Sequence, residues 1–92
     1  MEIKYFAYIR DYTGEKQTSW NTPAADLAEL LKQLSLRYGN RFRDAVFDQP
    51  QTDLNPLIII IINGRHVKHL NGIHTKLAMN DTISIFPVVA GG

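Results

Sequence analysis

Residues 57–64, Leu-Ile-Ile-Ile-Ile-Ile-Asn-Gly, contain the longest apolar run of the chain. The run follows Pro56 and ends at an Asn-Gly pair, which strongly favours a two-residue hairpin turn. A short, branched apolar run between two such breakers is typical of a strand that is buried on both faces. We therefore predict a strand over residues 57–62 in the middle of a sheet, followed by a short edge strand over residues 65–69.

Polar and apolar residues alternate in two further segments, as they do in strands with one buried face. The first segment, residues 2–10, leads through turn residues 11–14 into a predicted returning strand over residues 17–20. The second segment, residues 82–87, ends at Pro87, which has no amide hydrogen to donate to a neighbouring strand. We therefore expect an N-terminal antiparallel hairpin and a last strand that stops at this proline.

One segment has the signals of a long helix. Thr22 is the predicted N-cap, Pro23 is the predicted first helical residue, and Gly39 is suited to end the helix. Between them, an apolar stripe at helical spacing predicts the face that packs on the sheet; it comprises Leu27, Leu30, Leu31, Leu34 and Tyr38. Residues 41–47 are expected to add a short helical turn that buries Phe42 together with Val46 or Phe47.

The predicted order is strand, strand, helix, strand, short strand and last strand, which indicates a two-layer α+β fold. The β-grasp arrangement of ubiquitin has this order, with its first and last strands parallel at the centre of the sheet. We expect a single β-grasp domain over residues 1–92, in which one main helix covers a mixed sheet of about five strands. Residues 87–92 are expected to form a flexible tail.

The composition argues against several classes of function. Ten Lys and Arg side chains against nine Asp and Glu side chains give a net charge of +1, too small to indicate nucleic-acid binding. The chain has no cysteine, which excludes disulfides, thiolate metal sites and a cysteine nucleophile. The N-terminus lacks a signal-peptide pattern, and the longest apolar run is too short to span a bilayer. We therefore expect a cytoplasmic protein that binds neither nucleic acid nor membranes.

The three histidines of the chain are His66, His69 and His74. Their spacing is not that of two imidazoles one turn apart on a helix, and no carboxylate cluster accompanies them. We expect them to be surface side chains on an edge strand and a loop, and we expect no metal site.

The chain ends in Gly91-Gly92. At an average glycine frequency of about 7%, chance places such a pair at a chain end with a probability of roughly half a per cent. Glycine lets a terminal carboxylate enter a narrow site in another enzyme, because the backbone can approach closely and adopt unusual dihedral angles. The stretch after Pro87 can extend by roughly 17 Å, enough to reach into a partner's interior. The terminal carboxylate is therefore a candidate reactive group.

The terminal motif is part of a wider resemblance. Residues 86–92, Phe-Pro-Val-Val-Ala-Gly-Gly, resemble the Phe-Pro-Pro-Val-Ala-Gly-Gly ending of the MoaD-type sulfur carriers, the small subunits of molybdopterin synthase. Two other parts of the chain are similar to this family: residues 6–10 with Gly14, and residues 62–64 with residues 77–86. Val88 replaces the family's second proline, and Asn80 replaces a glycine. The chain thus resembles the MoaD/ThiS-type ubiquitin-like sulfur carriers over nearly its whole length.

This resemblance implies a function for the terminus. An E1-like adenylyltransferase of the MoeB type uses ATP to adenylate the Gly92 carboxylate, and a sulfur donor system converts the acyl-adenylate to a thiocarboxylate. The loaded tail, with Val88, Val89, Ala90 and Gly91, enters the active site of a large synthase subunit of the MoaE type. There the sulfur passes to the pterin precursor of a molybdenum or tungsten cofactor. The chain itself is expected to bind no cofactor and to be a non-catalytic, sulfur-carrying subunit.

A docking surface is expected beside the tail. Phe86 lies on the face of its strand opposite to the predicted core, so we expect it to be exposed next to Pro87. Phe6 and Tyr8 are expected to join this surface, because their strand is predicted to run beside the last one. For Arg10 the alternatives are support of this same surface and a solvated side chain, and we expect the solvated side chain.

Three alternative functions remain open. A thiamine-type sulfur carrier uses the same chemistry, although such carriers are generally shorter and lack the Phe-Pro-x-Val-Ala ending. A ubiquitin-like protein modifier uses the activated Gly92 carboxylate to acylate lysines of target proteins. An interaction module with an inert tail needs no reactive terminus at all.

Overall fold

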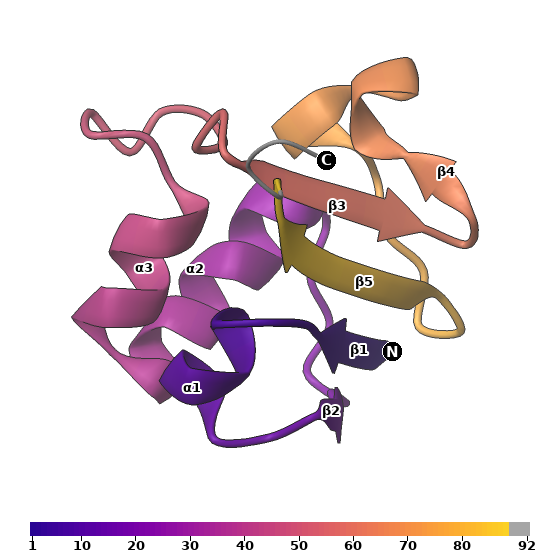
Figure 1. Ribbon diagram of the computed structural model, residues 1–92. Coiled ribbons are helices and arrows are strands. Elements are labelled where there is room, and N and C mark those ends of the chain that lie inside the picture. Colours follow the sequence, from indigo (N-terminus) through magenta and orange to yellow (C-terminus); the bar gives the residue numbers. More distant parts are fainter. Residues whose placement is uncertain (89–92) are drawn as a thin grey trace.

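The computed structural model describes residues 1–88, and within them five strands form one mixed sheet in the order β2-β1-β5-β3-β4. The strands are β1 (Glu2–Tyr5), β2 (Gln17–Ser19), β3 (Ile58–Ile62), β4 (Arg65–His66) and β5 (Thr82–Pro87). β1 and β5 run parallel, and the other neighbouring pairs run antiparallel. With its first and last strands parallel at the centre, this is the predicted β-grasp fold (Figure 1).

The isoleucine-rich strand β3 differs from its prediction in two respects. It is not the middle strand, because β5 occupies that position and β3 lies between β5 and the short edge strand β4. It is also buried on one face only: Ile58, Ile60 and Ile62 are buried, whereas Ile59 and Ile61 are half-buried. The helices cover one side of the sheet, so alternate side chains of β3 point to a face that no helix covers.

The N-terminal strand is shorter than predicted. β1 ends at Tyr5, and α1 (Ile9–Thr13) occupies most of the segment in which a continued strand and a turn were predicted. Ala7 has a left-handed φ of 53°, which breaks the extended backbone, and Ile9 and Thr13 are then buried four residues apart on one helical face. The polar and apolar residues of this segment alternate as they do in a strand, and no local sequence signal predicts the break at Ala7.

The main helix, α2 (Leu27–Tyr38), begins later than Pro23 predicted, and its N-cap is Asp26 rather than Thr22. The Asp26 carboxylate accepts a hydrogen bond from the Glu29 amide at 2.9 Å, which satisfies a donor of the first turn. The residues before Leu27 pair with another segment instead: the Leu77 amide donates to the Ala25 carbonyl at 3.3 Å. This long-range pairing delays the helix start.

The apolar stripe of α2 packs as predicted. Four of its leucines, Leu27, Leu30, Leu31 and Leu34, are completely buried in a single core with the inner residues of β1, β3 and β5. The predicted short turn is also helical, as α3 (Asn40–Val46), and it buries Phe42 and Val46, with Phe47 buried directly after it. In Figure 1, α2 passes behind the sheet and α3 lies beside α2. The core therefore lies between the helices and one sheet face.

The remaining elements close the edge of the sheet beyond β4. The edge strand predicted over residues 65–69 is extended only at Arg65 and His66, because the chain then turns into the 3-10 helices η1 (Val67–His69) and η2 (Gly72–His74). Val67 and Ile73 are buried under this turn. Among residues 1–88, no helix has the length and the hydrophobicity that a membrane span requires.

Candidate functional site

The candidate site lies where the chain leaves the central strand β5. β5 ends at Pro87, as predicted, and Pro87 lies opposite Ile58 in the register of β3 and β5. The next residue continues the contact: the Val88 amide donates to the Leu57 carbonyl at 2.8 Å. The chain is thus held to β3 through Val88. The predicted tail residues Val89, Ala90, Gly91 and Gly92 lie outside the described residues.

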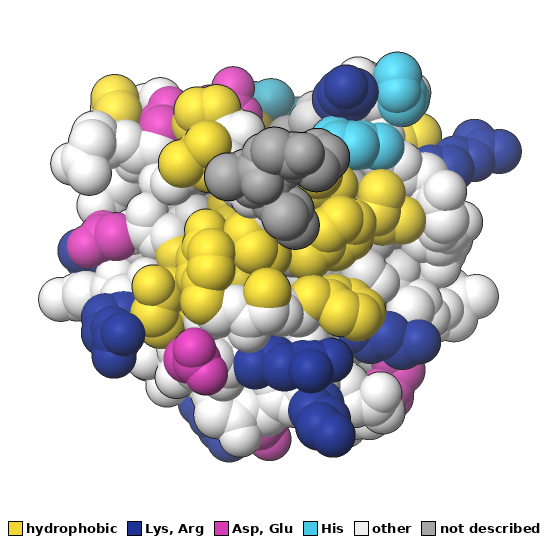
Figure 2. All heavy atoms as spheres, in the orientation of Figure 1, with side chains coloured by type: hydrophobic (Ala, Val, Ile, Leu, Met, Phe, Trp, Pro, Cys, Tyr) yellow, Lys and Arg dark blue, Asp and Glu magenta, His cyan; other side chains and the backbone are white. Residues whose placement is uncertain are grey.

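An apolar hollow of about 380 Å³ lies on the outer face of the sheet, beside this exit. We call it the β5 groove; its lining consists of Phe6, Ala7, Ile61, Ser84, Phe86 and Pro87. Alternation along β5 explains its position, because Ile83 and Ile85 point into the core and Ser84 and Phe86 point outward. Figure 2 shows hydrophobic side chains gathered in a band across this face, bordered on one side by Lys and Arg side chains.

Two phenylalanines shape one end of the β5 groove. The rings of Phe6 and Phe86 meet edge to face, with centroids 5.8 Å apart and planes at 84°. Phe6 remains 37% exposed although it has this partner. Such edge-to-face pairs are stabilised by the opposed charge distributions of ring edge and ring face. The predicted exposure of Phe6 beside the last strand is confirmed, whereas Phe86, which was also predicted to be exposed, is half-buried because the Phe6 ring packs against it.

Arg10 is exposed, as predicted, and it also supports this aromatic pair. Its guanidinium carbon lies 5.5 Å from the centroid of the Phe6 ring, within the range of a cation–π interaction. Its Nε donates to the Tyr5 carbonyl at 2.8 Å. Arg10 reaches both groups because α1 turns the chain back over the end of β1. Both contacts depend on the unpredicted helix α1, so alternation along the chain could not predict them.

Tyr8 lies apart from the Phe6–Phe86 pair. It is the N-cap residue of α1 rather than a strand residue, and its ring lies 5.8 Å from the ring of Tyr12. Together with Tyr12 and Arg41 it lines a different hollow, in which the Arg41 guanidinium lies 4.7 Å from the centroid of the Tyr12 ring. The assumed strand position of Tyr8 is therefore wrong, and its role in docking stays a prediction.

The histidines lie on the edge of the sheet. His66 Nδ1 accepts a hydrogen bond from the Lys68 amide at 3.1 Å, and the His66 and His69 rings are 6.0 Å apart. Partial burial lowers the pKa of His66, and the nearby charges of Lys68 and His69 lower it further. Across residues 1–88, no three His, Cys, Asp or Glu side chains are grouped in a way that could hold a metal ion.

A hydrogen-bond network links the inner face of the sheet to the end of α2. The Tyr5 hydroxyl donates to the Tyr38 hydroxyl at 3.3 Å, and Tyr38 in turn donates to Glu15 Oε2 at 2.6 Å. The hydrogen bonds that Tyr38 and Thr18 donate to the Glu15 carboxylate lower its pKa, because they stabilise its charged form. Burial raises the pKa of Tyr5 above its usual range. The network stabilises the fold on the side away from the β5 groove.

The chemistry of the β5 groove is that of binding. Its lining offers aromatic and aliphatic surface and one hydroxyl, that of Ser84, but no acid or base. Such a surface suits an apolar partner that covers the sheet face next to the departing chain.

A sequence model of the ThiS family matches residues 3–92, which is nearly the whole chain. The chain belongs to the ThiS family. This confirms the resemblance to the MoaD/ThiS-type ubiquitin-like sulfur carriers that the terminal motif predicted. The matched region extends through Gly92 and so includes the positions of both terminal glycines.

Relatives of this ThiS-family chain include modifier proteins. It is 32% identical over its full length to small archaeal modifier protein 3 of Haloferax volcanii, of which 98% is covered. The solution structure of small archaeal modifier protein 1 from Methanosarcina acetivorans is similar with a TM-score of 0.84 and 28% identity, covering 99% of this chain and 94% of that one. A Pyrococcus furiosus structure assigned as molybdopterin converting factor subunit 1 has a TM-score of 0.74 and 25% identity, covering 96% and 95%.

Proposed function

We propose that this chain is a sulfur carrier that reacts through the carboxylate of Gly92 and donates sulfur for molybdopterin synthesis, as the small subunit of a molybdopterin synthase. The observation that carries the proposal is the Phe-Pro-Val-Val-Ala-Gly-Gly ending, which begins in the central strand at the Phe6–Phe86 pair. The similarity to the Pyrococcus furiosus protein supports the molybdopterin assignment.

The proposed reaction has two steps at Gly92. The carboxylate attacks the α-phosphorus of ATP in an E1-like adenylyltransferase of the MoeB type, which forms the acyl-adenylate and releases pyrophosphate. Sulfide from a sulfur donor system then attacks the acyl carbon, forming the thiocarboxylate and releasing AMP. Adenylation is needed because a free carboxylate is a poor electrophile, whereas AMP is a good leaving group. The chain supplies the carboxylate, and the partner enzyme binds the ATP.

The described residues contribute binding and position. The β5 groove gives a partner an apolar surface at the end of β5, and the Val88–Leu57 hydrogen bond fixes the position of the residue that follows this strand. A large synthase subunit of the MoaE type would receive those residues in its active site. Because the activating enzyme consumes ATP, we place the reaction in the cytoplasm.

The test is intact-mass analysis after incubation with ATP, a MoeB-type enzyme and a sulfide source. We expect the mass change that corresponds to replacement of one oxygen by sulfur, located at Gly92 by peptide fragmentation. The chain that lacks Gly92 should show no such change. An unmodified full-length chain in the presence of an active, cognate activating enzyme would contradict the proposal.

A second candidate function is protein modification, which the relation to small archaeal modifier protein 3 favours. The same acyl-adenylate can react with a lysine amine instead of sulfide, forming an isopeptide bond and releasing AMP. Higher-mass conjugates of an N-terminally tagged chain, absent when Gly92 is deleted, would support this function. Thiocarboxylate formation without conjugates would favour the carrier alone.

A further inference from the structure

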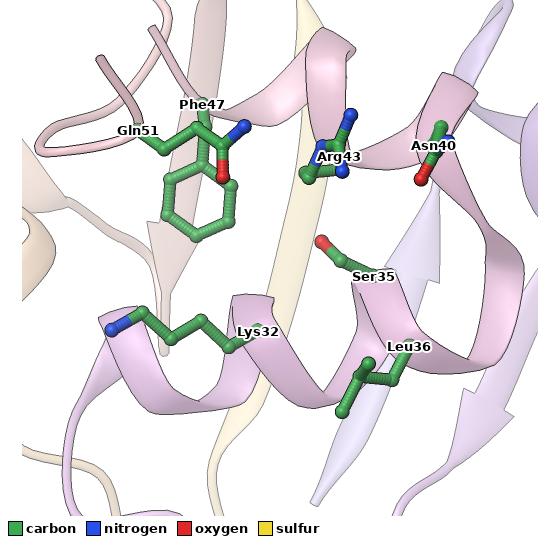
Figure 3. A pocket seen from close by; sticks show the side chains of 7 residues that line it. All are labelled: Lys32, Ser35, Leu36, Asn40, Arg43, Phe47 and Gln51. Carbon is green, nitrogen blue, oxygen red and sulfur yellow. The ribbon is translucent and has the colours of Figure 1, made fainter.

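The helical layer has a hollow of its own, which the proposed tail chemistry does not use. It measures about 260 Å³ and lies between α2 and α3. We call it the α2–α3 groove; its lining consists of Lys32, Ser35, Leu36, Asn40, Arg43, Phe47 and Gln51. In Figure 3 the Phe47 ring lies between the two helices, the Lys32 side chain lies below it, and Ser35 Oγ points into the space between the helices. Gly39, with a left-handed φ of 100°, makes the sharp connection that brings α3 alongside α2.

The charged side chains that line this groove are all positive. Lys32 and Arg43 contribute the charges of its lining, and no acidic side chain lines it. Arg43 is paired with Asp44 at 3.2 Å, but this pair uses Nε, so the edge formed by the two terminal nitrogens can still hold a carboxylate. The nearby Asp48 carboxylate accepts hydrogen bonds from the Thr52 and Asp53 amides of its own loop. The α2–α3 groove is therefore complementary to an anionic group.

The same groove presents apolar surface. Leu36 is 90% exposed, the highest value among the exposed large apolar side chains of residues 1–88. Phe47 is only 4% exposed and forms the floor beside it. A leucine that is left in water is a site at which a partner gains by burying apolar area. An inorganic anion would use the two cations but would leave Leu36 uncovered.

Polar groups suited to a peptide backbone border this surface. Asn40 and Gln51 each contribute an amide that can both donate and accept hydrogen bonds. Gln51 has a left-handed φ of 59°, an uncommon conformation that its loop maintains through the hydrogen bond from the Gln51 amide to the Asp48 carbonyl. The groove thus combines cations, an apolar floor and amide groups, which together fit a chain of mixed residues.

We propose that the α2–α3 groove binds an acidic peptide segment of a partner protein. A bulky apolar side chain of the segment packs on Leu36 and Phe47, and flanking carboxylates bind Lys32 and Arg43. The groove lies in the helical layer, whereas Phe6 and Phe86 lie on the outer face of the sheet. One partner can therefore hold the chain by its helices while another engages the β5 groove and the Gly92 carboxylate.

The test is an NMR titration of the uniformly 15N-labelled full chain with a synthetic peptide that carries one leucine between glutamates. We expect shift changes at the amides of Lys32, Ser35, Leu36 and Arg43, and weaker binding at higher ionic strength. The Lys32→Glu, Arg43→Glu double variant should bind at least about tenfold more weakly. The matched double variant Lys16→Glu, Lys76→Glu makes the same charge change at two exposed lysines outside both grooves and should change binding by less than about twofold.

A second variant protects the test against misfolding of the charge-reversed chain. Leu36→Ser alters a fully accessible side chain and leaves the charges in place, so it should fold and still bind more weakly. Thiocarboxylation at Gly92 should be unchanged in all these variants, which separates this proposal from the function of the tail. The proposal would be overturned by an absence of shifts or by shifts centred on Phe86. It would also be overturned by equal losses of affinity in the two double variants, or by equal shifts with inorganic phosphate or with a peptide in which glutamines replace the glutamates.

Discussion

The two faces of β5 differ in what they contribute. Its inner residues, Ile83 and Ile85, are completely buried in the same core as the leucine stripe of α2. Its outer residues, Ser84 and Phe86, are half-buried and line the β5 groove. Because successive residues of a strand point to opposite faces, one strand can stabilise the fold and present a binding surface at the same time. Stability and docking are therefore expected to respond to different substitutions only one position apart.

The largest effect is expected from a change that leaves both faces intact. Addition of a single residue after Gly92 converts the reactive carboxylate into an amide, so adenylation and thiocarboxylate formation should be lost completely. Intact-mass analysis with the activating enzyme checks this result. The free energy of unfolding should equal that of the unmodified chain. Full activity of the extended chain, without prior cleavage, would show that the terminal carboxylate is not the reacting group.

Ile85→Ala tests the inner face. The substitution leaves a cavity in a core that is fully buried, so we expect the free energy of unfolding to fall by about 2–5 kcal/mol. Urea denaturation followed by circular dichroism measures the loss. Affinity for the activating enzyme should be unchanged at temperatures where the variant remains folded. If Ile85→Ala bound the activating enzyme more weakly but kept its free energy of unfolding, the inner face would be the docking surface, contrary to this prediction.

Phe86→Ala, one residue later, tests the outer face. We expect the complex with the activating enzyme to lose about 2 kcal/mol, the size of an interface hot spot, because the aromatic edge of the β5 groove is removed. The free energy of unfolding should fall by less than in Ile85→Ala, since Phe86 is only half-buried. Isothermal titration calorimetry gives the affinity. A Phe86→Ala chain that binds normally would remove the β5 groove from the docking surface.

Arg10→Ala sharpens the description of the outer face. It removes the cation–π contact to Phe6 and the hydrogen bond to the Tyr5 carbonyl, so the Phe6–Phe86 pair should be less well positioned. We expect a loss of about 0.5–1 kcal/mol in the affinity for the activating enzyme. Arg10→Lys is the matched control, because it keeps the charge but lacks the Nε group. Equal affinities for wild type, Arg10→Lys and Arg10→Ala would contradict a positioning role.

The smallest effect on stability is expected from the hydrogen-bond network that joins Tyr5, Tyr38 and Glu15. Hydrogen bonds from Tyr38 and Thr18 lower the pKa of Glu15 in the folded state. A lowered pKa means that the stabilisation is present above the pKa of the unfolded chain and is lost as the pH falls through the folded-state pKa. The stability difference between wild type and Glu15→Gln should therefore shrink on acidification. Urea denaturation of both chains, from neutral pH to a pH below the folded-state pKa of Glu15, measures this difference in the free energy of unfolding. A difference that stays constant would contradict a stabilising role for the hydrogen bonds to the Glu15 carboxylate.

The elements that the sequence predicted well are those with strong local signals. The alternation of residues 82–87 predicted the inner and outer faces of β5, and the stripe of α2 predicted its buried leucines. The helix start was wrong because Thr22 and Pro23 are good local signals, whereas the pairing of the Ala25 carbonyl with the Leu77 amide delays the helix. No local pattern reports a hydrogen bond to a segment so distant in the chain.

The candidate site was also predicted only in part, because some of its features follow from local patterns and others depend on tertiary structure. Phe6 and Phe86 were placed on one surface by alternation and by the expected parallel pairing of the first and last strands, both of which the structure has. Tyr8 was misplaced and the contacts of Arg10 were not predicted, because both depend on α1, which begins only after the left-handed turn at Ala7. A helix of this length is set by its surroundings rather than by its own propensity.

The sequence by itself determined the order of the strands and the main helix, the β-grasp fold, the faces of β5 and the terminal glycine motif. These features depend on periodicity and on residue type, which neighbours along the chain express directly. Only the tertiary structure decided that β5 rather than β3 is central, that Val88 stays paired with Leu57, and that Arg10 stacks on Phe6. Each of these is a contact between distant segments, and its free energy comes from pairing and packing that no short stretch of the chain contains.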